Sequence, residues 1–198
     1  MGYVRIWWGK EGMPRIVDHD RYREELARRA VDVFREHGYH GLSMRRIARE
    51  IGVSKGVLYH YFPSKHALFE ACSRQATEVA VESLPPGASR ADRERALVHL
   101  AERIEDTFAG ELTVLLDYTR GRSPDDISRD PQLRASLGRY RDSVATLVGK
   151  NLADAVLAQM FGVLFRRMID GRSTSMRQVC DVLEALEDCP PTPASRSE

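Results

Sequence analysis

The sequence predicts an all-α protein of about nine helices in two domains. Apolar residues recur at the 3.6-residue spacing of amphipathic helices along most of the chain, and no strand pattern competes with them. Two short segments, each opened by a serine and joined across Ile51-Gly52-Val53, have the pattern of a helix-turn-helix. With 198 residues, of which 42% are apolar, the chain is long enough to bury a core.

Charge is unevenly distributed, although the formal net charge is only +1. Residues 1–74 hold 14 lysine and arginine residues against 9 acidic ones, and residues 75–198 hold 16 against 20. Positive charge therefore concentrates in the part of the chain that carries the helix-turn-helix pattern, which favours nucleic-acid binding there. An architectural DNA binder without sequence preference would spread such charge over the whole surface.

The three cysteines, Cys72, Cys180 and Cys189, lack metal or redox spacing, which favours a reducing, cytoplasmic setting. No secretory signal is visible, and the most apolar run, Leu152 to Phe165, is shorter than the ~20 residues that span a bilayer. We therefore expect no membrane segment, no metal and no cofactor.

The first 63 residues are expected to form a flexible leader, 1–17, and a helix-turn-helix domain, 18–63. Asp18 is a plausible N-cap of a first helix that ends near His37, before Gly38. Ser43 caps the second helix and Ser54 the third. The tight crossing of these two helices needs a small residue, a turn residue with positive φ and an apolar plug, which are Ala48, Gly52 and Leu58.

The block from Gly38 to Lys65 includes SMRRIA, GVSKGVLYHYF and SK, and it strongly resembles the DNA-binding domain of TetR-family bacterial regulators. The resemblance covers roughly Arg21 to Ala71. It implies a three-helix domain whose third helix reads the major groove. It also implies a fourth helix, 64–84, that connects this domain to a helical regulatory and dimerisation domain, 64–189. A disordered tail, 190–198, would follow.

The resemblance also assigns DNA-contacting residues. It implies backbone positioning by Ser43, Tyr59, Tyr61 and Lys65, and contact near bases by Arg45, Ser54, Lys55, Gly56 and His60. Arg46 departs from the family, because many members have an acidic residue there. Contact between Arg46 and DNA is left open.

Beyond residue 64, the apolar periodicity predicts a fourth helix that runs to the break at Pro85-Pro86-Gly87, a fifth that ends near Gly110, and a short helix from Glu111 to Arg120. A polar loop, 121–130, precedes a seventh helix capped by Asp130-Pro131. The eighth, around 152–165, has more than one apolar stripe. The ninth, about 175–187, repeats this with Val179, Val182, Leu183 and Leu186. These surplus apolar faces predict a homodimer through the last two helices.

The sequence says least about the regulatory ligand and the residues that bind it. Helices that line pockets in the resembling family carry, in this chain, Phe108, Tyr118, Tyr140, Phe161 and Phe165, with Arg120 as a polar anchor. Such a lining favours an unknown small, hydrophobic or amphipathic molecule.

Together these patterns predict a DNA-binding transcriptional regulator. We expect a homodimeric repressor that binds a partly palindromic double-stranded operator and is released by a small-molecule inducer. A thiol- or metal-responsive regulator is the alternative. A small all-α enzyme is disfavoured, because no nucleophile, base and orienting group stand at motif spacing.

Overall fold

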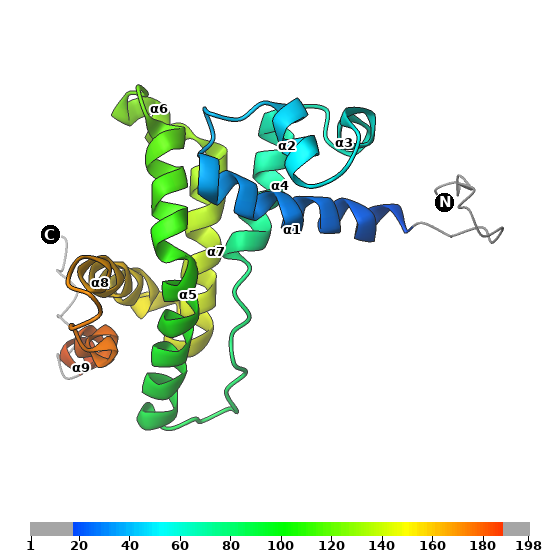
Figure 1. Cartoon of the computed structure of the whole chain (residues 1–198). Helices are drawn as coiled ribbons and strands as arrows, with labels where there is room; N and C mark the ends of the chain where they lie inside the picture. The colour runs from blue at the N-terminus through cyan, green and yellow to red at the C-terminus, as the bar shows by residue number, and fades with distance from the viewer. Residues whose placement is uncertain (1–17, 188–198) are drawn as a thin grey trace, which may run out of the picture. The chain divides into compact units, whose positions relative to one another are not determined.

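The computed structural model describes residues 18–187, and within them it contains nine α-helices, one 3₁₀ helix and no strand (Figure 1). The expected leader, 1–17, and tail, 190–198, lie outside the described residues. The contacts divide the chain into two compact units. The N-terminal unit comprises residues 18–76 and Val114–Arg120, and the C-terminal unit comprises Thr77–Thr113 and residues 121–187.

The N-terminal unit begins with three helices whose starts were all predicted by capping residues. These are α1 (His19–His37), α2 (Met44–Glu50) and α3 (Lys55–Tyr61). Asp18 Oδ1 accepts the backbone N–H groups of Asp20 and Arg21, and α1 ends at Gly38 with a φ of 70°. The first-helix prediction is therefore confirmed.

The next helix, α4 (Lys65–Thr77), ends earlier than predicted, because the expected fourth helix extended to residue 84. Residues 78–84 are not helical. Val79 and Val81, two residues apart, both pack against the core of the C-terminal unit, as alternate side chains of an extended segment can do. Arg103 also donates to the backbone oxygen of Ala80 at 2.6 Å, which holds this segment extended.

Helix α5 (Arg90–Thr119) is continuous, although a break near Gly110 was predicted. A glycine inside a helix costs ~1 kcal/mol relative to alanine but leaves the backbone hydrogen bonds intact. Buried Ile104 and Val114 on either side of Gly110 supply tertiary packing that outweighs this cost. The two predicted helices are therefore one, and its last turns belong to the N-terminal unit.

The segment 121–130 was predicted to be a loop, but it contains a short helix, α6 (Pro124–Arg129). Ser123 Oγ accepts the N–H of Asp126 at 3.2 Å, and proline occupies the first helical position. Serine followed by proline is a start signal that the polar composition of this segment masked. Helix α7 (Pro131–Val148) begins, as predicted, after Asp130.

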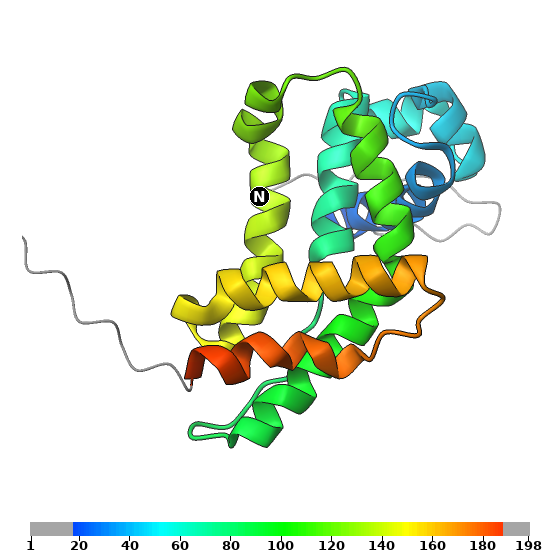
Figure 2. The same cartoon turned by 90° about the vertical axis from the view of Figure 1, so that its left-hand side faces the viewer.

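The C-terminal unit ends with α8 (Lys150–Ile169), the 3₁₀ helix η1 (Met176–Cys180) and α9 (Asp181–Glu187). Figure 2 shows α8 and the η1–α9 segment side by side and antiparallel. One buried apolar cluster joins α5, α7, α8, η1 and α9. The predicted ninth helix is thus part 3₁₀ and part α.

The predicted apolar surplus of the last helices needs correction. Val179 and Leu183 are 0% exposed, because they complete the core of their own unit. The side chain of Leu186 lies outside the described residues. On α8, however, Phe165 is 47% and Ile169 is 68% exposed, so a surplus face remains there.

Within the described residues no single helix is long and apolar enough to cross a membrane. Only α7 and α8 taken together pass that test of length and composition, and they are bent by 117° at their junction.

Candidate nucleic-acid interface

The turn between α2 and α3 is held by short-range bonds that the sequence predicts. Ser43 Oγ accepts the N–H of Arg46 at 3.3 Å, and Ser54 Oγ accepts the N–H of Val57 at 3.1 Å. Gly52 adopts a φ of 71°, which is the left-handed region that a side chain would disfavour. Ala48 and Leu58 are 2% and 0% exposed. The three-point helix-turn-helix prediction is therefore confirmed.

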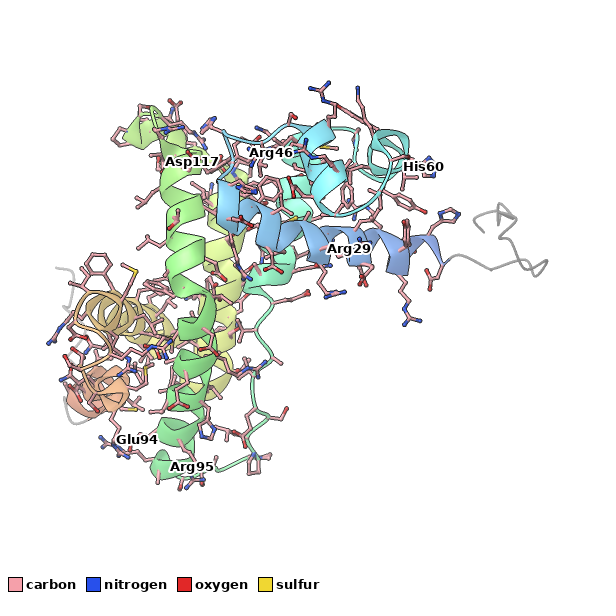
Figure 3. All side chains as sticks on the ribbon, in the orientation of Figure 1. Arg29, Arg46, His60, Glu94, Arg95 and Asp117 are labelled. Atoms are coloured by element: carbon pink, nitrogen blue, oxygen red, sulfur yellow. The ribbon has the colours of Figure 1, made fainter. Side chains whose placement is uncertain are left out.

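A long side chain from α1 adds support that the sequence did not reveal. The guanidinium of Arg29 donates to the backbone oxygen of Ile51, the last residue before Gly52 (Figure 3). A Cβ at Gly52 would lie 3.4 Å from Arg29 Nη2. Helix α1 thereby fastens the turn that orients α3.

One face of α3 is exposed and carries most of the predicted base-contacting residues. Lys55, Gly56, Tyr59 and His60 are all exposed, at positions that adjoin on a helix surface. The Lys55 ammonium lies 5.4 Å from the centre of the Tyr59 ring. A cation, a phenol and an imidazole on one helix can bond phosphate oxygens and base edges.

Helix α2 adds positive charge beside this face. Ser43 and Arg45 are exposed, as a DNA-facing role requires. Arg46 Nε lies 3.9 Å from Glu50 Oε1, and Arg49 Nη2 lies 3.2 Å from the same oxygen. One carboxylate is thus shared by two guanidinium groups, which leaves a net positive charge on α2.

Tyr61 has a different position from the one that the resemblance implied. Its hydroxyl lies 2.8 Å from His19 Nδ1, and its ring meets Tyr22 edge-on at 5.3 Å. Burial, and then the neighbouring Tyr22, raises the pKa of Tyr61. The structure therefore makes Tyr61 a packing residue between α3 and the start of α1.

Lys65 is also turned into the protein rather than toward a phosphate. Its Nζ donates to the backbone oxygens of Tyr39 at 2.8 Å and Leu42 at 2.9 Å, and it lies 4.2 Å from the centre of the Tyr39 ring. Burial lowers the pKa of this ammonium group. Its place in the first turn of α4 faces the loop between α1 and α2, whose carbonyl groups need donors.

Three of the six predicted ligand-binding residues come together in the C-terminal unit. The ring centres of Tyr140 and Phe161 are 5.6 Å apart, and those of Phe108 and Phe161 are 6.1 Å apart. Sequence reasoning missed Glu111, whose Oε2 accepts the Tyr140 hydroxyl at 2.5 Å and whose Oε1 accepts that of Thr107 at 2.7 Å. The spacing of Thr107 and Glu111, one helical turn apart, was the feature of the sequence that could have indicated a hydrogen-bonded pair at this place.

The other three predicted ligand-binding residues lie elsewhere. Tyr118 belongs to the N-terminal unit, where its ring stacks on Phe69 at 4.9 Å. Arg120 is exposed and pairs with Asp117 at 3.0 Å. Phe165 faces solvent on α8. The spacing of residues along each helix could not show that these three lie apart from the aromatic cluster around Tyr140.

The described residues give no support to a thiol or metal response. Cys72 is buried, its Sγ donates to the backbone oxygen of Ala27 at 3.2 Å, and burial raises the pKa of the thiol far above its usual range. Cys180 is also buried. Among residues 18–187, no group of three or more histidine, cysteine or acidic side chains is placed to hold a metal ion.

Comparison with known proteins identifies the type of the helix-turn-helix domain. The family model for bacterial regulatory proteins of the tetR family matches residues 26–72. The helix-turn-helix domain of this chain is therefore of the TetR type. The chain is 28% identical over 173 residues to the transcriptional repressor AcnR of Corynebacterium diphtheriae, with 82% of the chain and 89% of AcnR covered.

Solved structures agree with that assignment. A TetR-like regulator from Rhodococcus sp. RHA1 is 26% identical with a TM-score of 0.54, and the match covers 88% of this chain and 95% of that one. The multidrug binding protein EbrR, 23% identical, matches with a TM-score of 0.59 over 88% of this chain and 98% of its own. The chain is a DNA-binding transcriptional regulator with an N-terminal helix-turn-helix.

Proposed function

We propose that this regulator is a repressor that binds a partly palindromic operator as a homodimer and is released by a small molecule. The observation that carries this proposal is the exposed face of α3. Its side chains Lys55, Tyr59 and His60 are free of the protein core and could contact DNA if α3 lay in the major groove. The name of AcnR as a repressor favours repression over activation.

DNA binding would combine phosphate contacts with a few base contacts. Lys55 and Arg45 supply charge, and the Tyr59 hydroxyl suits a phosphate oxygen. We assign the contacts with base edges to His60 and Gly56, which are exposed on the same helix. Because most of the affinity comes from phosphates, it is expected to fall steeply with salt.

We assign the dimer interface to the outer face of α8. Ala158, Gly162, Phe165 and Ile169 are exposed, and their spacing places them on one face of the helix. Small residues at 158 and 162 permit close approach of a second helix, and the two apolar side chains beyond them gain from burial. A homodimer that binds a palindromic operator needs its two α3 helices in successive major grooves, roughly 34 Å apart.

We assign the ligand site to the cluster around Tyr140. Phe108 and Phe161 are half-buried against the core beside the buried ring of Tyr140, and the Glu111 carboxylate accepts the Tyr140 hydroxyl. EbrR, of similar fold, was solved in complex with imidazole, which supports a small-molecule site in this fold. A ligand releases DNA only if it binds the DNA-incompetent conformation more tightly.

The DNA-contact proposal is tested with Lys55→Ala and Tyr59→Phe. Operator DNA is first selected with the wild-type protein from fragments of its source genome. Each substitution should weaken binding to that DNA without changing dimer content. Lys150→Ala, which removes the same charge from the start of α8, is the control. Unchanged binding in both α3 variants would refute the assignment.

The interface proposal is tested with Ile169→Glu. A carboxylate on the α8 face should convert dimer to monomer, measured by analytical ultracentrifugation. Leu116→Glu changes an equally exposed leucine, 63% exposed, in the N-terminal unit and should leave the dimer intact. Dimer content equal to wild type in Ile169→Glu would place the interface elsewhere.

The ligand proposal is tested by thermal-shift screening with small aromatic and amphipathic compounds. A compound that raises the melting temperature of the wild type should act less on Glu111→Gln and Phe161→Leu. The same compound should also release the wild-type protein from the selected operator. A turnover assay with the same compound separates this function from catalysis, because an enzyme would consume the compound.

We also propose that the protein is located in the cytoplasm, because that is where the DNA of a bacterial operator lies.

A further inference from the structure

The loop between α1 and α2, residues 38–42, is gripped by a carboxylate from the end of α5. Asp117 Oδ2 accepts the backbone N–H of His40 at 2.7 Å (Figure 3). A Cβ on Gly38 would lie only 2.8 Å from the same oxygen. Gly38 also has a φ of 70°, which favours glycine, and a side chain at this position would push the Asp117 carboxylate aside.

The neighbouring residue, Tyr118, adds a second contact between α5 and this loop. Tyr118 is 7% exposed, and its ring lies 5.0 Å from that of Tyr39 and 4.9 Å from that of Phe69. Tyr39 and Phe69 are themselves in edge-on contact at 4.9 Å. The last turns of α5 therefore contact both the loop and α4 through packed aromatic rings.

The opposite side of the loop is held by Lys65, which donates to the carbonyl groups of Tyr39 and Leu42. The loop thus has an acceptor, Asp117, for its N–H group and a donor, Lys65, for its C=O groups. It leads directly into Ser43, the N-cap of α2. A displacement of this loop would therefore move the helix on which α3 packs.

Helix α5 extends far into both units, whereas α4 lies in the N-terminal unit except for its last residue, Thr77, whose hydroxyl accepts Arg139 Nε of α7 at 2.5 Å. Residues Arg90 to Thr113 of α5 pack with the C-terminal unit, and Val114 to Thr119 pack with the N-terminal unit. Its 30 residues give a length of about 45 Å. Helix α4 ends at Thr77, where residues 78–84 continue without helical structure. A continuous helix carries a displacement along its axis better than an extended segment does.

We propose that Asp117 is a positioning residue for DNA binding, and that the end of α5 carries the state of the C-terminal unit to the helix-turn-helix through the loop 38–42. This inference rests on the proposed ligand-dependent release, for which it supplies the route. It assigns the transmitting role to α5 rather than to the fourth helix, which the family resemblance made the connection between the two domains. The N–H of His40, and then the guanidinium of Arg120, lower the pKa of Asp117, because both favour its carboxylate form.

The test uses the full-length dimer, the operator selected by the wild type, and amide hydrogen exchange. Reciprocity requires that if the C-terminal unit controls DNA binding, saturating operator must alter exchange in that unit, for example over α7 and α8. In Asp117→Ala, operator affinity should fall about tenfold, within the usual range of coupling between sites. The exchange response of α7 and α8 to saturating operator should be lost.

Two further variants make the result specific. Asp117→Asn keeps an oxygen that can accept the N–H of His40, so it should retain most of the exchange response and rescue the alanine variant. Asp106→Ala removes an exposed carboxylate from the same helix and should behave as wild type. A merely structural role for Asp117 would lower stability and affinity but leave the response at saturating operator unchanged.

Each outcome decides between the two proposals. A wild-type response in Asp117→Ala overturns the role of Asp117 and leaves ligand-dependent release standing. If Asp117→Ala does not fold, loss of the response in folded Asp117→Asn would equally overturn the acceptor role. An absent response in the wild type itself would contradict ligand-dependent release as well.

Discussion

The two units are stabilised in different ways. In the N-terminal unit, α1, α2 and α3 each begin at a side chain that bonds to its own first turn, namely Asp18, Ser43 and Ser54. In the C-terminal unit, a single cluster of buried apolar residues joins helices that are far apart in sequence. Helices α6 and α7 of the C-terminal unit are capped in the same way, by Ser123 and Asp130, and the N-terminal unit has buried residues of its own. The units differ in that local bonds set the starts of the short helices α2 and α3, whereas packing between distant residues arranges the long helices of the C-terminal unit.

The largest expected effect separates the stabilities of the two units. Phe62 is 0% exposed and lies 4.7 Å from the Arg23 guanidinium. Replacing it with alanine should cost about 3–5 kcal/mol of unfolding free energy, because a large cavity opens in a small core. Circular dichroism should show an early transition for the N-terminal unit, with the helices of the C-terminal unit melting later. A single cooperative transition would show that the units do not unfold independently.

A smaller effect is expected from a charged pair in the C-terminal unit. Arg167 Nε lies 2.8 Å from Glu105 Oε1, and both side chains are 13% exposed. Glu105→Ala leaves the guanidinium largely buried without its carboxylate, which should cost about 3 kcal/mol. Asp106→Ala, at the exposed end of a 3.9 Å pair with Arg172, should cost less than about 1 kcal/mol. Urea unfolding measures both, and equal costs would contradict the role of burial.

The helix caps give a matched comparison of the units. Ser54→Ala and Ser123→Ala each remove a bond from serine Oγ to a first-turn N–H, worth about 1 kcal/mol of local stability. Only Ser54→Ala should also weaken operator binding, because it loosens the first turn of α3. Fluorescence anisotropy with the selected operator provides the measurement. A comparable loss in Ser123→Ala would mean that DNA affinity is as sensitive to α6 as to α3.

The smallest effect is expected at Cys72. Burial raises the pKa of its thiol, so the reactive thiolate is scarce at neutral pH. In a Cys189→Ser background, labelling of Cys72 should proceed only as fast as the N-terminal unit opens, and a mild oxidant should leave operator affinity unchanged. Rapid labelling with loss of DNA binding would favour the thiol-responsive alternative.

The sequence by itself determined the helix-turn-helix and the residues that bond within it. Ser43, Gly52 and Ser54 act through bonds and backbone angles that involve residues only a few positions away. Such interactions can be recognised in a linear sequence, because the two partners always lie a fixed, small number of residues apart. The starts of α1 and α7 were predicted for the same reason.

Only the tertiary structure decided the roles of Lys65, Tyr61 and Tyr118. Their partners, respectively the carbonyl groups of the loop 38–42, His19, and the rings of Tyr39 and Phe69, are distant in sequence. The continuity of α5 and the early end of α4 were likewise set by packing that outweighs local propensity. A residue type and its helix face do not specify which distant group it meets, since that depends on how separate helices are brought together.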